Sequence, residues 1–365
     1  MQLYQQGNST HIINNIFKFC MTSAVTLSSI LIMHNALADA KLKPVVDVYK
    51  TTQISAKQIQ KKFGHDLQTF ATLFTSPESI TSERNAQKME KLLIKMTNKI
   101  NKMGDFSYVS VSPILYSSKE PVYITIDVVD KTDKTRLPDF LPKPRESFTD
   151  PDHLIKTWME YQTAGFAASI KHDNKPLYKT CPAFHCLFGF EYPALKKYQT
   201  TFVTLVPKNK GQLVKILRKD QDENKRAVAA LLLAHLKNGN EVLKILTPSI
   251  YDSSSNVRNN VMRVLADTLS KVKTTDFPIK TIIIAMDFPK ETDRNKALNV
   301  AFALSFQQKY AHYLAKHAGP ALLEQLKLSQ PNLHKLSYDI LVNISGKKFN
   351  ERDYQAWEGW IKGKA

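Results

Sequence analysis

The chain has 365 residues, of which 43% are hydrophobic, and its 51 Lys and Arg against 33 Asp and Glu give a formal net charge of +18. This length can bury a sizeable core and has room for two or three domains, and the hydrophobic content is typical of a folded protein. The motifs GxGxxG, GxxxxGK[ST], GxSxG and HExxH are missing from the sequence, which argues against the commonest nucleotide enzymes, serine hydrolases and zincin proteases.

Residues 1–40 have the pattern of an export signal. A weakly basic start that ends at Lys18 precedes an apolar stretch, Ala24–Met33, which is too short to span a bilayer. Two overlapping A-x-A sites then predict cleavage after Ala38 or Ala40; the alternative is an uncleaved amphipathic anchor. We therefore expect a periplasmic or secreted protein whose mature form has no stable membrane span.

Residues 41–130 predict a small α/β domain. A β-prone run at Val45–Tyr49 is followed by a helix that a capping box within Ser55–Gln58 opens and that Gly64 would close. A longer helix over Glu83–Met103 has apolar residues at helical spacing. Two strands complete the domain, and the order is strand, helix, helix, strand, strand.

The last two strands are predicted at Phe106–Tyr116 and Pro121–Val129. In the second of them, apolar residues from Val122 to Val128 share one face and Tyr123, Thr125 and Asp127 share the other. This alternation predicts a sheet that helices cover on one side.

The segments MGDFSYV (103–109) and ITIDVVDK (124–131) resemble a POTRA domain, the β-α-α-β-β module of outer-membrane assembly proteins. The resemblance implies a binding module whose sheet edge receives a strand from a partner. The alternative is that the module is a structural cap for the next domain.

A proline-rich segment, 131–151, predicts a linker, and a helical connector is expected over 152–206. This connector holds both cysteines that follow the export signal, Cys181 and Cys186. An even, minimal cysteine count in an exported chain predicts a disulfide between them, in a turn that Pro182 helps to form.

Two alternatives stay open for this cluster. Cys181, His185 and Cys186 could bind a metal with a fourth ligand such as His172, although the spacing is no recognised zinc motif. Cys186 and His185 could also form a nucleophilic pair, although adjacency in sequence does not imply the geometry that such a pair needs. We predict no cofactor.

Residues 207–348 predict repeated helix pairs, followed by a C-terminal helix or tail over 349–365. Three predicted second helices align on Arg226, Arg258 and Arg294, at steps of 32 and 36 residues. Periods of this size indicate an α-solenoid, which makes the chain multidomain, a small α/β module followed by an all-α region.

The segment DSSSNVR (252–258) resembles the HEAT/armadillo repeat, which has an aspartate in the interhelical turn and an arginine early in the second helix. The resemblance implies a structural ladder, in which each aspartate pairs with the arginine of a neighbouring repeat. The alternative is that the arginines bind a phosphate-rich ligand. The ladder residues are Asp220, Arg226, Asp252, Arg258, Asp287 and Arg294.

Over about 150–345 the chain also resembles uncharacterised bacterial exported proteins with HEAT repeats, in HCLFGFEYPAL, VRNNVMRVLA and DRNKAL. We expect a non-enzymatic scaffold that binds other proteins, those of the cell envelope first, through the concave surface of its solenoid. The alternatives are a basic solenoid for an anionic ligand, either nucleic acid or glycolipid, and a cysteine-dependent hydrolase.

Overall fold

The computed structural model describes residues 43–76, 82–116, 120–171, 181–189 and 192–364. The export signal predicted over residues 1–40 lies outside these ranges. The chain divides into two compact units, one of Met1–Leu137 with Pro289–Glu291 and one of Pro138–Phe288 with Thr292–Ala365. The protein is rich in helix and has one small sheet, so the prediction of a small α/β module followed by a helical region is confirmed.

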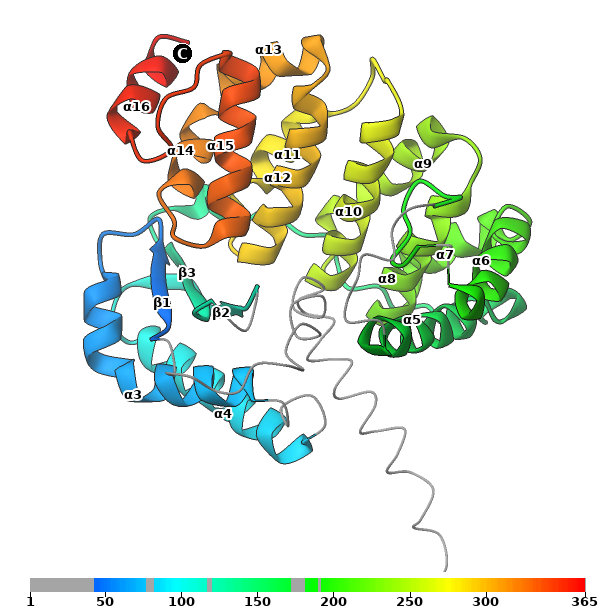
Figure 1. Cartoon of the computed structure of the whole chain (residues 1–365), viewed down its shortest axis with the longest axis horizontal. Helices are drawn as coiled ribbons and strands as arrows, with labels where there is room; N and C mark the ends of the chain where they lie inside the picture. Colours follow the sequence, from blue (N-terminus) through cyan, green and yellow to red (C-terminus); the bar gives the residue numbers. More distant parts are fainter. Residues whose placement is uncertain (1–42, 77–81, 117–119, 172–180, 190–191, 365) are drawn as a thin grey trace, which may run out of the picture. The chain divides into compact units, whose positions relative to one another are not determined.

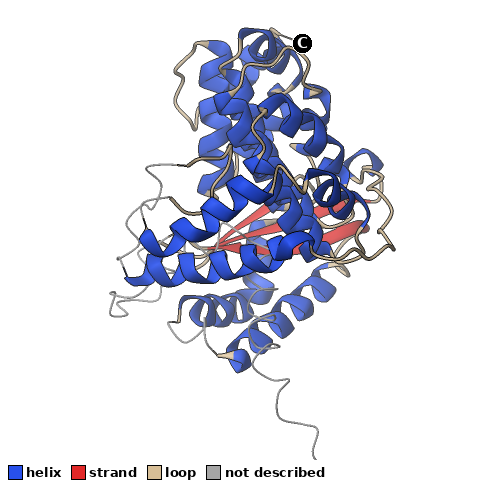
Figure 2. Ribbon diagram, turned by 90° about the vertical axis from the view of Figure 1, so that its right-hand side faces the viewer, coloured by secondary structure: helices blue, strands red, loops and turns tan. Residues whose placement is uncertain are grey.

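The first unit contains a three-stranded sheet in the order β1-β3-β2. Strand β1 (Val45–Tyr49) runs parallel to β3 (Tyr123–Asp130), and β2 (Phe106–Ile114) runs antiparallel to it on the other side. Figure 2 shows the strands in red. The predicted order of strands and helices along the chain is confirmed, and β1 and β2 are the two edges of the sheet.

Two helices lie between β1 and β2 in the chain, α3 (Ala56–Thr75) and α4 (Glu83–Ile100). Ser55 opens α3 as predicted, because its Oγ accepts from the Gln58 amide and its own amide donates to Gln58 Oε1. The prediction that Gly64 closes this helix is wrong. A mid-helix glycine costs only about 1 kcal/mol, whereas the apolar face continues beyond it through Leu67, Phe70 and Phe74, all buried.

Helices α3 and α4 pack on the sheet to form one hydrophobic core. It contains Ile59, Phe63, Leu67, Phe70, Met89, Met96 and Ile100 from the helices and Val46, Ile124, Ile126 and Val128 from the strands. On the other face of β3, Thr125 and Asp127 are also buried. Ser112 Oγ, on the neighbouring strand β2, donates a hydrogen bond to Asp127 Oδ2 at 2.8 Å.

The second unit is built from consecutive helices. Its helices are α5 (Leu154–Lys171), α6 (Pro193–Leu205), α7 (Lys210–Lys219), α8 (Glu223–Leu232), α9 (Gly239–Leu246), α10 (Ser255–Lys271), α11 (Ile279–Ala285), α12 (Glu291–Ser305), α13 (Gln308–His317), α14 (Gly319–Leu326), α15 (Pro331–Ser345) and α16 (Tyr354–Lys362). Helix α8 packs between α7 and α10, α9 packs on α10, and α14 packs on α15 (Figure 1).

Aromatic side chains are buried at both ends of this unit. Near its start, the Trp158 ring contacts Tyr161 and Phe202, and near its end Trp357 contacts Tyr338 and Phe349. Both tryptophans are 0% exposed. Among the described residues, no helix combines the length and the apolar character that crossing a membrane requires.

Candidate binding surface on the helical unit

Three buried arginines repeat one geometry along the interhelical turns. Arg226, Arg258 and Arg294 lie in the first turns of α8, α10 and α12 and are at most 4% exposed. Each Nη1 donates to the backbone carbonyl six residues earlier, at 2.8, 2.7 and 3.1 Å. Each arginine therefore closes the turn that precedes its own helix.

The same arginines also reach the next helix pair. Arg226 binds Asp252 through two hydrogen bonds, Nε to Oδ2 at 3.0 Å and Nη2 to Oδ1 at 2.8 Å. Arg258 donates from Nε and Nη2 to Asp293 Oδ2, at 3.1 and 2.5 Å. Arg294 Nε contacts Gln325 Oε1 at 3.4 Å. The contacts thus form a row in which each turn is linked to the following one.

The sequence predicts that Asp287 supplies the third turn carboxylate of the row. This prediction is wrong, because Arg258 binds Asp293 instead. The carbonyls bound by Arg226 and Arg258 belong to Asp220 and Asp252, whereas the equivalent carbonyl for Arg294 belongs to Phe288. Asp287 therefore lies one position too early. The carboxylate comes instead from Asp293, whose Oδ1 also accepts from Asn259 Nδ2 at 2.7 Å.

Asp220 stands at the first turn of the row and binds a different segment. Its Oδ2 accepts the Phe148 amide at 3.0 Å, and its Oδ1 accepts the Asp222 amide at 2.8 Å. Lys225 Nζ lies 3.6 Å from Oδ2. We call residues 138–150, the segment that contains Phe148, the strap.

The strap is fastened along the turns by its backbone and by one aromatic ring. The Leu141 amide donates to Tyr251 O at 2.7 Å, and the Gln221 amide donates to Glu146 O at 2.6 Å. The Phe140 ring lies edge-on to Phe288, with the Arg258 guanidinium carbon 3.9 Å from its centroid. Cation–π contact of this kind adds to the hydrogen bonds.

The segment that the sequence predicts as a linker over 131–151 is therefore divided by the structure. Its first part, up to Leu137, belongs to the first unit. There the buried Arg136 donates from Nη1 to Val128 O at 2.9 Å and stacks over the Tyr49 ring. Its second part, from Pro138, belongs to the helical unit as the strap.

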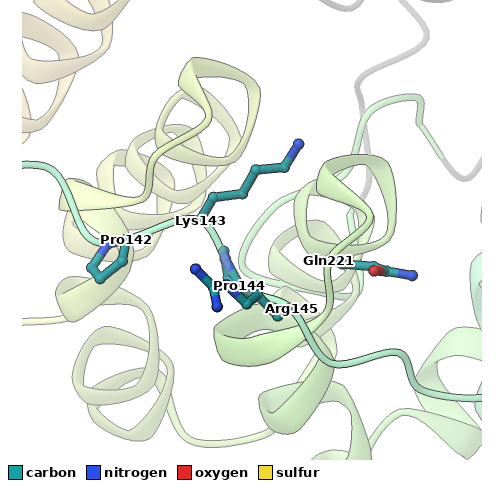
Figure 3. A pocket seen from close by; sticks show the side chains of 5 residues that line it. All are labelled: Pro142, Lys143, Pro144, Arg145 and Gln221. Carbon is teal, nitrogen blue, oxygen red and sulfur yellow. The ribbon is translucent and has the colours of Figure 1, made fainter.

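An open cleft of about 730 Å³ lies at the strap. It is lined by Pro142, Lys143, Pro144, Arg145 and Gln221 (Figure 3). Lys143 and Arg145 are exposed, and their side chains leave the strap in different directions. Within the described part of the chain neither cation has an ion pair or a hydrogen bond from its side chain. The cleft therefore presents two positive charges to solvent.

The cysteine cluster forms a short loop that is fastened to α10. The sulfur atoms of Cys181 and Cys186 lie 2.09 Å apart, with a Cα separation of 5.7 Å. Lys271 Nζ donates to the carbonyls of Ala183 and Phe184, at 3.0 and 2.9 Å. The two cysteines are paired as a disulfide, as predicted, whereas the metal and nucleophile alternatives require a free thiolate. The fourth ligand suggested for a metal, His172, lies outside the described residues.

Two buried histidines lie at this loop. His185 Nδ1 is 2.6 Å from Asp267 Oδ2, and its buried Nε2 has no hydrogen-bond partner among the described residues. Burial lowers the pKa of His185, against the opposite effect of the Asp267 carboxylate. Burial also lowers the pKa of His235, to about 4, although its Nδ1 donates to Leu232 O. Burial thus favours the neutral form of both imidazoles.

The sequence did not reveal several of these residues. Nothing in the spacing identifies Gln325 as the acceptor for Arg294, or Asp267 as the partner of His185, which lies 82 residues away. The strap carried one usable signal, the two phenylalanines Phe140 and Phe148 within an otherwise polar, proline-rich segment.

Comparisons with models of protein families, with curated proteins and with solved structures give no match to this chain. The resemblances to HEAT repeats and to a POTRA domain therefore remain predictions that rest on sequence pattern and geometry.

Proposed function

We propose that this protein is an exported, non-enzymatic scaffold that binds other proteins, and that its helical unit is a HEAT-like α-solenoid. The repeated arginine geometry supports the solenoid, because equivalent contacts recur at 32- and 36-residue steps along the chain. Solenoids offer extended surfaces suited to protein partners. The first unit is, in this proposal, a POTRA-like module whose sheet edges β1 and β2 add a second binding element.

One observation carries the proposal: the row of interhelical turns already holds an extended peptide, the strap. It does so through backbone groups at Leu141, Glu146 and Phe148. Backbone hydrogen bonds do not depend on side-chain identity, so a surface that binds one extended segment in this way can bind others. A partner would form backbone hydrogen bonds of the same kind along the exposed side of the strap.

A second candidate function is the binding of an anionic ligand such as nucleic acid or glycolipid. The exposed, unpaired Lys143 and Arg145 favour it, as does the formal charge of +18. The two functions differ in salt dependence. Binding that neutralises several phosphates is lost steeply with salt, by roughly a thousandfold or more between about 50 and 200 mM.

Affinity capture from the envelope fraction tests the proposal, with the chain from Lys41 onward as bait. The scaffold function predicts the retention of one or a few discrete proteins at both salt concentrations. Retention of nucleic acid or lipid alone, lost at the higher concentration, would favour the second candidate. Turnover of a small substrate with no protein retained would refute the scaffold.

A further inference from the structure

We infer that the strap cleft recognises an extended peptide segment that carries two or more carboxylates, supplied by the partner protein. This inference rests on the proposed scaffold function and names the chemistry of its partner. It is built from the charges at the cleft, the rigidity of the strap and the direction of the side chains.

The cations of the cleft are not neutralised by the acidic groups of the strap. Glu146 lies 3.4 Å from Lys219, and Asp150 caps α5 by accepting the amides of Ile155 and Lys156. Asp139 does not line the cleft. The charges of Lys143 and Arg145 are therefore available to a ligand, and charge complementarity selects an acidic one.

The backbone that carries these cations is held in place before a ligand arrives. Pro142 and Pro144 restrict their own φ angles, and hydrogen bonds from Leu141 N to Tyr251 O and from Gln221 N to Glu146 O fasten the strap on both sides of the cleft. A site on such a backbone loses little chain entropy on binding. This distinguishes Lys143 and Arg145 from lysines on an unconstrained surface.

The arrangement suits carboxylates spaced along a peptide better than one phosphate group. Lys143 and Arg145 diverge in Figure 3, so they do not converge on a single anion. The prolines on either side of Lys143 have no N–H group, so they add no backbone donors of the kind that phosphate sites use. An arginine, in contrast, binds one carboxylate through two parallel hydrogen bonds, while the lysine can bind the next acidic residue along the peptide.

The test measures the binding of a fluorescent hexaglutamate peptide to the chain from Lys41 onward, by anisotropy in about 50 mM salt. The double variant Lys143→Gln/Arg145→Gln is compared with Lys196→Gln/Lys208→Gln. The control pair is also exposed, removes the same charge and lies on or after α6, which contributes nothing to the cleft. We expect the cleft variant to bind about tenfold or more weakly and the control within about twofold of the wild type.

Equal losses in both variants would show attraction to the net charge and would overturn the inference, as would a lack of binding to the wild type. Hexathymidylate is the competitor. If it binds more tightly than hexaglutamate and depends on the same two cations, the site is a phosphate site and the inference is wrong. If the cleft variant still captures the envelope proteins that the wild type captures, the inference fails and the scaffold function stands.

Discussion

Two regions of the helical unit accommodate buried ionisable groups in opposite ways. Along the turns, buried arginines keep their charge, and Arg226 and Arg258 meet the carboxylates of Asp252 and Asp293. At the cysteine loop, His185 and His235 are also buried, and burial lowers the pKa of each, which favours the neutral form. The stability of the turns therefore depends on each arginine keeping its carboxylate partner, whereas the stability of the cysteine loop depends on pH.

The largest expected effect comes from removing a carboxylate from the row. Asp252→Ala leaves Arg226 buried without its two-bond partner, and breaking a buried pair in this way costs about 3–5 kcal/mol. Chemical denaturation of the variant, beside Asp276→Ala at an exposed site, measures the loss. A change within about 0.5 kcal/mol, as expected for the control, would show that Asp252 does not stabilise the turn.

The second effect concerns the loop that carries His185. Cys181→Ser/Cys186→Ser removes the cross-link between residues five apart, and the loop-entropy relation gives a loss of about 2 kcal/mol. The variant should unfold at a lower denaturant concentration than the wild type. A reductant should lower the midpoint of the wild type to that of the variant and leave the variant unchanged. A midpoint that is insensitive to both changes would argue against the cross-link in solution.

The third effect is the pH dependence of stability that the cysteine loop introduces. In the folded protein the pKa of His235 is lowered to about 4, whereas an unfolded histidine titrates near 6.5. Protonation therefore favours the unfolded chain: the stability is complete above about pH 6.5 and falls by about 1.4 kcal/mol per pH unit below it, until the folded pKa is reached. At about pH 5 the loss is about 2 kcal/mol.

His235→Phe tests this expectation, because phenylalanine keeps a ring against Trp158 and Phe202 and cannot take up a proton. The slope of stability between about pH 5 and 6.5 should become shallower in this variant. The same replacement of the exposed His312 should leave the slope unchanged. An unaltered slope in His235→Phe would contradict the neutral, buried imidazole.

The smallest expected effect compares the neutral acceptor of the row, Gln325, with its carboxylates. Gln325 is a neutral acceptor, with Oε1 3.4 Å from Arg294 Nε and Nε2 donating to Met286 O at 3.1 Å. Gln325→Met keeps much of the volume and should cost about 1.5 kcal/mol, the low end for a hydrogen bond to a charged group, because the bond to Arg294 is long. A loss of stability as large as that of Asp252→Ala would show that the charge of the acceptor does not determine how much each contact of the row stabilises the protein.

Local rules predicted the local parts of this molecule. The capping box at Ser55 and the helix starts before Arg226, Arg258 and Arg294 follow from short-range hydrogen bonding. The sequence prediction chose Asp287 because it lies in the third turn, one position before the carbonyl that Arg294 binds. The carboxylate that Arg258 binds comes instead from Asp293, in the first turn of α12.

Long-range pairing was not predictable in the same way. The strap has no periodicity, and its bonds to Tyr251 and Asp220 join residues far apart in the sequence. The pairing of His185 with Asp267 depends likewise on how the loop meets α10. Such contacts are set by the packing of whole elements, which no local pattern encodes.

Site-specific photo-crosslinking from the cleft is the most direct test of the central claim, that the strap and the turns bind a protein partner. A photoreactive amino acid replaces the exposed Gln221, which lines the cleft, or the equally exposed Gln308 on α13 as the control. Irradiation of cells that express each variant should give one discrete protein adduct from position 221 and none from position 308. No adduct from position 221, or the same adducts from both positions, would contradict the account.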